Sequence, residues 1–144
     1  MSAAKLRLYW RIQLAAHHMQ KMADRELASS AQITTAQLGV LSVIANNKEI
    51  NQKDVALALG LNESAVTAMV RRLVALEYLN CKKSSRDGRA KTLSLTPTGI
   101  AVQKTAKLPF KKINEVIEST LSDNDISLLA DCLSRLTESF RGEA

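Results

Sequence analysis

The sequence predicts a mainly α-helical protein that contains a single two-stranded β-hairpin. Apolar residues recur at helical spacing along most of the 144 residues, as in amphipathic helices. Residues 84–97 depart from that spacing: an Asp-Gly pair, a strong hairpin signal, precedes alternating apolar and polar residues. The chain length suits one domain with a core of its own.

The composition is that of an ordinary soluble protein with an excess of positive charge. The net charge is +6, with 46% hydrophobic and 24% charged residues. No apolar run reaches the length of a membrane span, and the first residues lack the apolar segment of a signal peptide. These features predict a cytoplasmic protein without a membrane partner. Residues 63–91 hold seven basic and three acidic side chains, which indicates a polyanionic partner; a solvated basic face is the alternative.

Two amphipathic helices are predicted first. One runs over about residues 6–29, with an apolar stripe formed by Ile12, Ala15, Ala16, Met19, Met22, Ala23 and Leu27. The next begins near Thr34, which has capping-box spacing to Gln37, and ends at residues 46–48. Its expected buried side chains are Leu38, Leu41 and either Ile44 or Val43.

Two short helices follow with a tight turn between them. The first opens at Asn51 and stops at Gly60; Asn62 caps the second, which is expected to run to about Leu79. The expected buried residues of the first are Val55, Ala58 and Leu59. Because only three residues separate the two helices, they form a helix-turn-helix pattern.

The second of these helices divides into two faces. A mostly apolar face suited to the core carries Val66, Val70, Leu73 and Glu77. The opposite face carries Ser64, Thr67 and Arg71 at i, i+3 and i+7, with Arg72 beside them. Small hydroxyl side chains let a helix backbone approach DNA, and arginine can bond guanine through two N–H groups. This pattern predicts a recognition helix; an ordinary polar surface is the alternative.

The hairpin is predicted to present cations on a narrow projection. Arg86 and Arg89 flank its tip at Asp87-Gly88, and Leu93 and Leu95 alternate with polar residues towards the core. A projection of this shape and charge suits the minor groove or the phosphate backbone of DNA.

The remaining residues predict trailing helices. Thr96 caps a helix that begins at Pro97, and Pro109 is expected to kink or interrupt it. Ser122 and Asp125 open a last helix with the apolar stripe Ile126, Leu129, Leu133, Leu136 and Phe140. The stripes of the first and trailing helices exceed what a small core can cover, which predicts burial against a second copy of the chain.

Taken together, the helix-turn-helix at residues 52–79, the Asp87-Gly88-Arg89 wing and the Leu95-Thr96 pair before a helix resemble the MarR family of winged-helix transcription regulators. The resemblance covers nearly the whole chain. It implies a homodimer joined through the N- and C-terminal helices, which binds a pseudo-palindromic operator, most often as a repressor. It also implies release of the DNA by a small, often aromatic, ligand. In the wing, the resemblance implies that Arg89 contacts the minor groove and that Asp87 holds it by charge pairing.

The expected architecture is therefore mainly α: a winged helix-turn-helix core with a two-stranded wing, flanked by dimerisation helices. It is expected to form one domain over residues 1–144, with the core at about 34–96 and the dimerisation helices at about 5–29 and 97–141. The expected partners are double-stranded DNA and a second copy. The predicted DNA-binding residues are Ser64, Thr67, Arg71, Arg72, Arg86, Asp87, Arg89 and Lys91.

Other side chains suggest further roles. Tyr9 and Trp10, with Met19 or Met22, are candidates to line an effector pocket, although packing in the dimer interface is favoured for the two aromatic residues. Cys81 lies beside two lysines, a setting that favours oxidation, so a redox-sensing regulator is an alternative; a half-buried strand cysteine is favoured.

No enzyme, metal or cofactor is predicted. His17 and His18 are adjacent on a helix and point about 100° apart, and the sequence has no glycine-rich phosphate loop and no Gly-x-Ser-x-Gly motif. A last alternative is a protein-interaction module that has lost DNA binding, against which Arg71 and Arg89 argue.

Overall fold

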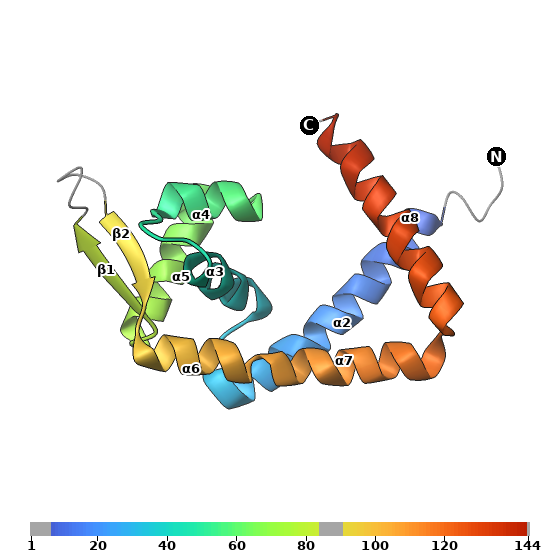
Figure 1. The fold of residues 1–144 in the computed structure, drawn as a ribbon, viewed down its shortest axis with the longest axis horizontal. Helices are drawn as coiled ribbons and strands as arrows, with labels where there is room; N and C mark the ends of the chain where they lie inside the picture. The colour runs from blue at the N-terminus through green and yellow to red at the C-terminus, as the bar shows by residue number, and fades with distance from the viewer. Residues whose placement is uncertain (1–6, 84–90, 144) are drawn as a thin grey trace. The chain divides into compact units, whose positions relative to one another are not determined.

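The computed structural model describes residues 7–83 and 91–143. The chain divides into two compact units, Met1–Pro109 and Phe110–Ala144. The described part is mainly helical with one antiparallel pair of strands, as predicted (Figure 1). Its elements are α2 (Leu8–Ala31), α3 (Thr35–Ala45), α4 (Gln52–Leu59), α5 (Glu63–Ala75), β1 (Leu79–Lys83), β2 (Lys91–Leu95), α6 (Pro97–Thr105), α7 (Lys107–Thr120) and α8 (Asp123–Arg141).

The first two predicted helices are confirmed as α2 and α3. Helix α2 ends at Ala31, and Gln32 then adopts the left-handed conformation with φ 58°. The predicted capping box of α3 is present: the Thr34 hydroxyl accepts from Gln37 N at 3.2 Å, and Gln37 Oε1 accepts from Thr34 N at 3.0 Å. Of the two candidates for burial near its end, Ile44 is buried and Val43 is only half-buried.

Helix α4 has the predicted boundaries but a different buried face. Asn51 caps it, and Gly60 ends it with φ 64°. Ala58, predicted to be buried, is exposed, and Ala56 is buried beside Val55 instead. Over two turns an apolar pattern leaves the direction of the buried face ambiguous, and packing against α3 and α5 decides it.

Helix α5 ends at Ala75, earlier than the predicted end near Leu79. Glu77 takes the left-handed conformation with φ 62°. Glu77 N donates to Val74 O and Tyr78 N to Leu73 O, both at 2.9 Å, so the last turn closes in the manner of a Schellman motif. Glu77, predicted on the apolar face of the helix, is therefore an exposed turn residue, and β1 begins at Leu79.

The predicted hairpin is confirmed in its two strands. Leu79 pairs with Leu95 and Lys83 with Lys91 in an antiparallel register. The outer edge of β2 is covered in part, because Leu93 N donates to Ile50 O at 2.8 Å. The predicted turn at Asp87-Gly88 lies outside the described residues.

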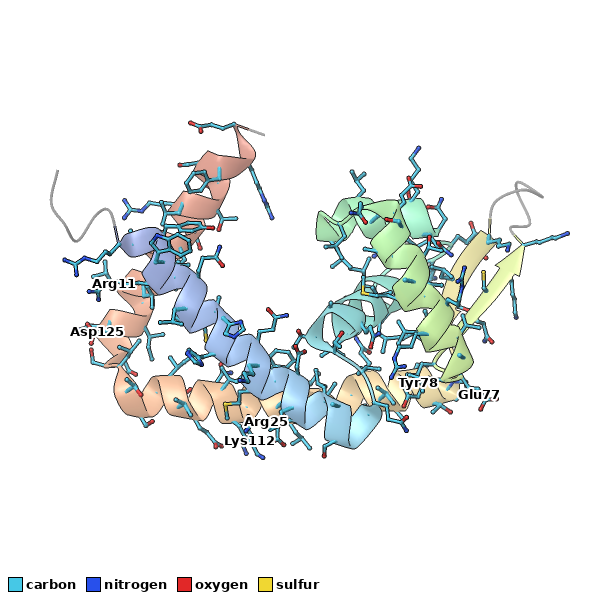
Figure 2. The ribbon with its side chains drawn as sticks, turned by 180° about the vertical axis from the view of Figure 1, so that it is seen from behind. Arg11, Arg25, Glu77, Tyr78, Lys112 and Asp125 are labelled. Atoms are coloured by element: carbon cyan, nitrogen blue, oxygen red, sulfur yellow. The ribbon has the colours of Figure 1, made fainter. Side chains whose placement is uncertain are left out.

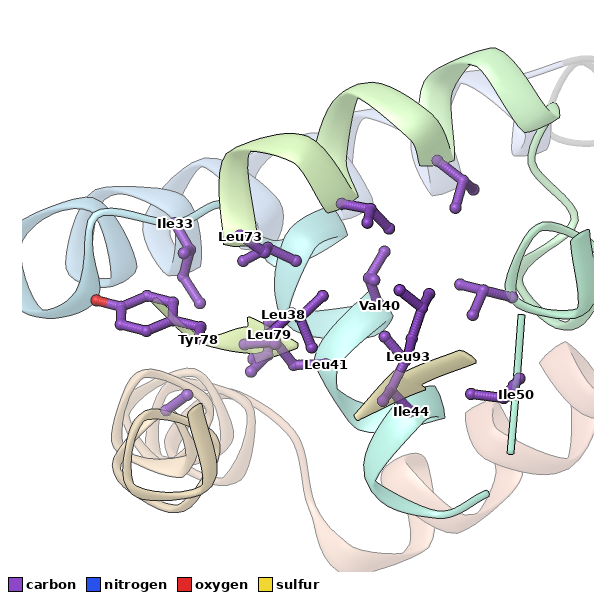
Figure 3. Close-up of a cluster of buried hydrophobic side chains, with 14 of the residues drawn as sticks. Ile33, Leu38, Val40, Leu41, Ile44, Ile50, Leu73, Tyr78, Leu79 and Leu93 are labelled. Carbon is purple, nitrogen blue, oxygen red and sulfur yellow. The ribbon is translucent and has the colours of Figure 1, made fainter. Parts of the chain in front are cut away.

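One hydrophobic cluster joins these elements (Figure 3). It includes the end of α2 as well as the helix-turn-helix and the strands. Its largest fully buried side chains are Leu27, Ile33, Leu41, Leu73, Leu93, Val40, Val55 and Val66.

The trailing helix is interrupted where proline predicts. Thr96 caps α6 by accepting from Gly99 N at 2.9 Å, and Ala106 separates α6 from α7. Pro109 has no N–H to donate to the carbonyl of Thr105, four residues earlier, and its ring crowds that carbonyl. In the second unit, Ser122 and Asp125 open α8 as predicted, and the structure shows that they form a capping box.

Among the described residues, no single helix is both long and apolar enough to cross a membrane. Helices α2 and α3 meet that test only as a pair bent by 71°.

Candidate nucleic-acid interface

The start of α5 is fixed by its cap and by the turn before it. Asn62 Oδ1 accepts from Ala65 N and from the Ser64 hydroxyl, both at 3.0 Å. Leu61 N donates to Ala56 O at 3.0 Å, so the turn is tied back to α4. Ser64 is exposed at the first turn of α5, where backbone N–H groups carry partial positive charge. This end of the helix can accept a phosphate or a base edge.

Thr67 joins the two helices of the helix-turn-helix. Its hydroxyl lies 2.8 Å from Glu63 O and 2.9 Å from Gln52 Oε1, as donor to both. The proton of this half-buried hydroxyl is thus held inside the protein, and its oxygen can still accept from a partner. Gln52 was not singled out in the sequence, because the pairing spans 15 residues and no local pattern encodes it.

The two neighbouring arginines of α5 have different surroundings. Arg71 is exposed and makes no hydrogen bond or ion pair with any described residue. Arg72 Nη2 donates to the carbonyl of Gln32, at the end of α2, at 2.9 Å. Adjacent helical residues point about 100° apart, so the two guanidinium groups serve different neighbours.

Lysines gather on the two strands of the hairpin. Lys82 and Lys83 on β1 and Lys91 on β2 are exposed, and Lys83 lies directly opposite Lys91 in the register. Like charges directly opposite each other on neighbouring strands are unfavourable, and a polyanion would relieve the repulsion. Lys82 and Lys83 were counted in the basic segment of the sequence but not among the binding residues. The strand register, which places Lys83 opposite Lys91, is the observation that identifies them as candidate binding residues.

The other predicted interface residues are distributed as follows. Arg86, Asp87 and Arg89 lie outside the described residues. Cys81 on β1 is exposed, which corrects the prediction of a half-buried strand cysteine. The core covers Leu79 and Leu93, but it does not extend along β1 as far as Cys81.

The candidate effector-binding residues lie along α2. Tyr9 and Trp10 are 60% and 69% exposed and pack edge to face with their ring centroids 4.9 Å apart. Met19 is exposed and Met22 half-buried. None of the four lines the cavity of about 510 Å³ in the first unit, whose lining residues include Ile44, Lys48, Leu93, Leu95, Ile100 and Gln103.

The histidines of α2 are neighbours, with ring centroids 5.7 Å apart. Across residues 7–83 and 91–143, no group of three or more His, Cys, Asp or Glu side chains is arranged to hold a metal ion.

Known proteins that resemble this chain in sequence are transcriptional regulators or belong to the MarR family. The sequence profile described as the MarR family matches residues 31–90. A Thauera aromatica protein named for the transcriptional regulation of the hcr operon is 26% identical over 112 residues, which are 78% of this chain and 68% of that protein.

Two solved structures share the fold. The Staphylococcus aureus MepR–DNA complex has a TM-score of 0.82 and 22% identity, and covers 92% of this chain and 97% of MepR. PcaV from Streptomyces coelicolor, in complex with its natural ligand, has a TM-score of 0.73 and 24% identity, and covers 91% and 89%. The profile match over residues 31–90 includes α3, α4, α5 and β1, and together with these shared folds it makes the chain similar to the MarR family of winged helix-turn-helix transcriptional regulators.

Proposed function

We propose that this protein is a homodimeric repressor that binds a pseudo-palindromic operator, with α5 in the major groove and the wing along the minor groove. The observation on which the proposal depends is that the protein presents both an exposed arginine on α5 and a cross-strand pair of lysines on the wing. Both features place positive charge that no described residue pairs with on the helix-turn-helix and the hairpin, where phosphate and base edges would offset it. The DNA-bound MepR structure supports the same use of this fold.

Within that proposal, each contact has a defined role. Ser64 and Thr67 approach the bases or phosphates at the start of α5, and Arg71 reaches a base edge one turn further along. The lysines of the strands and Arg86 contact the backbone, and Arg89, held by Asp87, enters the minor groove.

The dimer is supported by the exposed apolar side chains of the helices outside the winged-helix core. Helix α8 buries none of its residues, and Leu128 and Phe140 are 64% and 67% exposed. Helix α2 exposes Leu8, Tyr9, Trp10, Ile12, Leu14 and Met19. Apolar area of this extent is typical of a protein–protein interface, and a second copy presents a matching surface.

A small-molecule effector is supported by the ligand-bound PcaV structure and by the aromatic pair on α2. Tyr9 and Trp10, with Met19 and Met22, would supply the apolar walls that an aromatic ligand needs. Binding next to the dimer helices would shift the distance between the two recognition helices, and the operator would be released.

A redox-sensing regulator is the second candidate, favoured by the exposed Cys81 on the wing strand. Oxidation there would add a polar group beside Lys82 and alter the wing's approach to DNA. Peroxide should then weaken DNA binding of the wild type and leave the Cys81→Ser variant unaffected. Equal responses of the two proteins would remove Cys81 from the mechanism.

The experiment that tests the main proposal is selection of bound DNA from a random library, followed by titration of the selected site at several salt concentrations. We expect a palindrome whose half-sites are about 10 bp apart and an affinity that falls steeply with salt as counterions are released. Failure to select DNA at low ionic strength, or a salt-insensitive interaction, would favour the protein-interaction module instead.

A further inference from the structure

The recognition helix is bonded to α2 at the point where α2 ends. The carbonyl groups of the last turn of any helix have no partner within that helix. Here two of them receive donors from the region where α5 ends: Arg72 Nη2 donates to Gln32 O, and the Tyr78 hydroxyl donates to Ala31 O, both at 2.9 Å. These two hydrogen bonds, termed the α2 anchor, span 40 and 47 residues of sequence.

Charge favours the first of these bonds. The C-terminal end of a helix carries a partial negative charge, and a cation near it is stabilising. The last turn of α2 contains no basic residue of its own. Arg72 on α5 therefore supplies the cation that the last turn of α2 lacks. The same hydrogen bond directs the Arg72 guanidinium towards α2, whereas the Arg71 guanidinium bonds no described residue.

Burial makes the second bond specific. Tyr78 is 9% exposed, and its ring lies in the hydrophobic cluster with Ile33 and Leu73 (Figure 3). A buried hydroxyl without a partner is costly, so the Tyr78 side chain holds the Ala31 carbonyl in one position.

The backbone of the same turn is bonded to the start of α6. Tyr78 O accepts from Thr96 N at 3.1 Å, and Glu77 O accepts from the Thr96 hydroxyl at 2.6 Å. Glu77 and Tyr78 lie at the end of α5 next to α6 (Figure 2). One short turn thus connects the recognition helix to both helices that lead out of the winged-helix core.

We propose that Arg72 and Tyr78 are positioning residues: they fix the recognition helix to the end of α2 and thereby set the distance between the two half-sites that the dimer can read. This inference rests on the proposed dimeric DNA binding, and it assigns the Arg72 side chain to a contact within the protein rather than to DNA. Without the α2 anchor, the direction of α5 relative to α2 varies more. The dimer then distinguishes less well between the selected operator and an operator whose half-sites are spaced differently.

The test compares the wild type with Tyr78→Phe and Arg72→Ala on the selected operator and on operators with one base pair more or less between the half-sites. Tyr78→Phe removes one buried oxygen that has no access to DNA, and it keeps the ring in the core. We expect each variant to lose roughly fivefold or more in affinity for the selected operator, with a smaller preference for its spacing. Affinity for random DNA and the salt slope should stay unchanged. Ser30→Ala is the matched control, because the Ser30 hydroxyl in the same helix turn donates to Glu26 O of its own helix and bonds no other described residue.

Three results would overturn the inference. Unchanged operator affinity and spacing preference in Tyr78→Phe would show that the anchor does not position α5. A salt slope reduced by about one in Arg72→Ala would place that side chain on a phosphate. Equal effects of Ser30→Ala would show a general response to instability.

Amide hydrogen exchange of the free protein tests the anchor without DNA. Faster exchange in the last turn of α2 and at Tyr78 N–H is expected in both variants and not in Ser30→Ala. Exchange unchanged from the wild type would overturn the anchor itself. If the wild type showed no operator spacing preference while both variants exchanged faster, the proposed function would fail and the structural anchor would stand.

Discussion

Gly99 lies where the start of α6 passes the backbone of Tyr78. A Cβ at this position would overlap the Tyr78 carbonyl oxygen, which cannot move freely because it accepts from Thr96 N. Gly39, in contrast, lies inside α3 and has only an ordinary contact, 3.6 Å from its ideal Cβ to Leu59 Cδ2. The two glycines therefore differ in what an added methyl group would meet.

Substitution by alanine should consequently have opposite effects at the two positions. Gly99→Ala should lower the free energy of unfolding by about 1–3 kcal/mol because the backbone must shift. Gly39→Ala should raise it by about 0.5–1 kcal/mol, since alanine favours the helix and fits the space. Urea denaturation measures both values; a neutral Gly99→Ala would refute the close approach of α6 to the turn.

Replacing single arginines should show which side chains contact base edges and which take part through the wing. Arg71→Ala should weaken operator binding by about 1–3 kcal/mol and relax the sequence preference at one position, because its guanidinium, which bonds no described residue, can bond guanine. Arg89→Ala should cost a similar amount if the wing enters a groove. Fluorescence anisotropy with operator variants provides the measurement, and an unchanged affinity for Arg89→Ala would mean that the wing does not take part.

At the scale of elements, helix ends rather than helix interiors set the boundaries of this fold. Capping boxes open α3, α4 and α8. At the last of these, hydrogen bonds from the Ser122 hydroxyl and backbone N–H hold the pKa of Asp125 below its ordinary value of 3.8. The ionised carboxylate is therefore favoured in the folded state.

This lowered pKa predicts a pH-dependent contribution to the stability of α8. The contribution is present at pH values above the unfolded pKa of the carboxyl group and is lost as the pH falls through the lower folded pKa. Asp125→Asn should thus lower the Tm at pH 7 and converge on the wild type in strongly acidic solution. Thermal melts followed by circular dichroism check this, and a difference in Tm that is the same at all pH values would contradict it. The group is fully exposed, so the shift in Tm should be small.

For the whole molecule, the apolar faces outside the winged-helix core should determine assembly. Leu133 of α8 is 38% exposed and belongs to the stripe predicted from the sequence. Leu133→Lys should weaken the dimer at least tenfold, since a lysine buried in an apolar interface has no partner for its charge. Ser134→Lys adds the same charge one position away, on the polar side of the helix. Sedimentation velocity at several concentrations distinguishes the two, and a monomeric wild type would refute the dimer.

The sequence by itself determined the order of the elements and most of their ends, because capping residues, Gly60, Pro97 and Pro109 act within a few residues of where they stand. It also indicated the exposed face of α5, since helical periodicity alone separates Arg71 from Leu73. These are local effects, and local patterns predict them.

Only the tertiary structure decided which polar groups meet across long stretches of chain. The Arg72 guanidinium donates to the Gln32 carbonyl, and the Thr67 hydroxyl donates to Gln52 Oε1. Helix α5 ends at Ala75, and the Glu77–Tyr78 turn that follows it accepts hydrogen bonds from Thr96 at the start of α6. The end of α2 joins the core for the same reason: Leu27 and Ala31 belong to the hydrophobic cluster to which α3 and α5 also contribute. Packing and buried hydrogen bonds depend on where distant segments come together, and no periodicity along the chain encodes that.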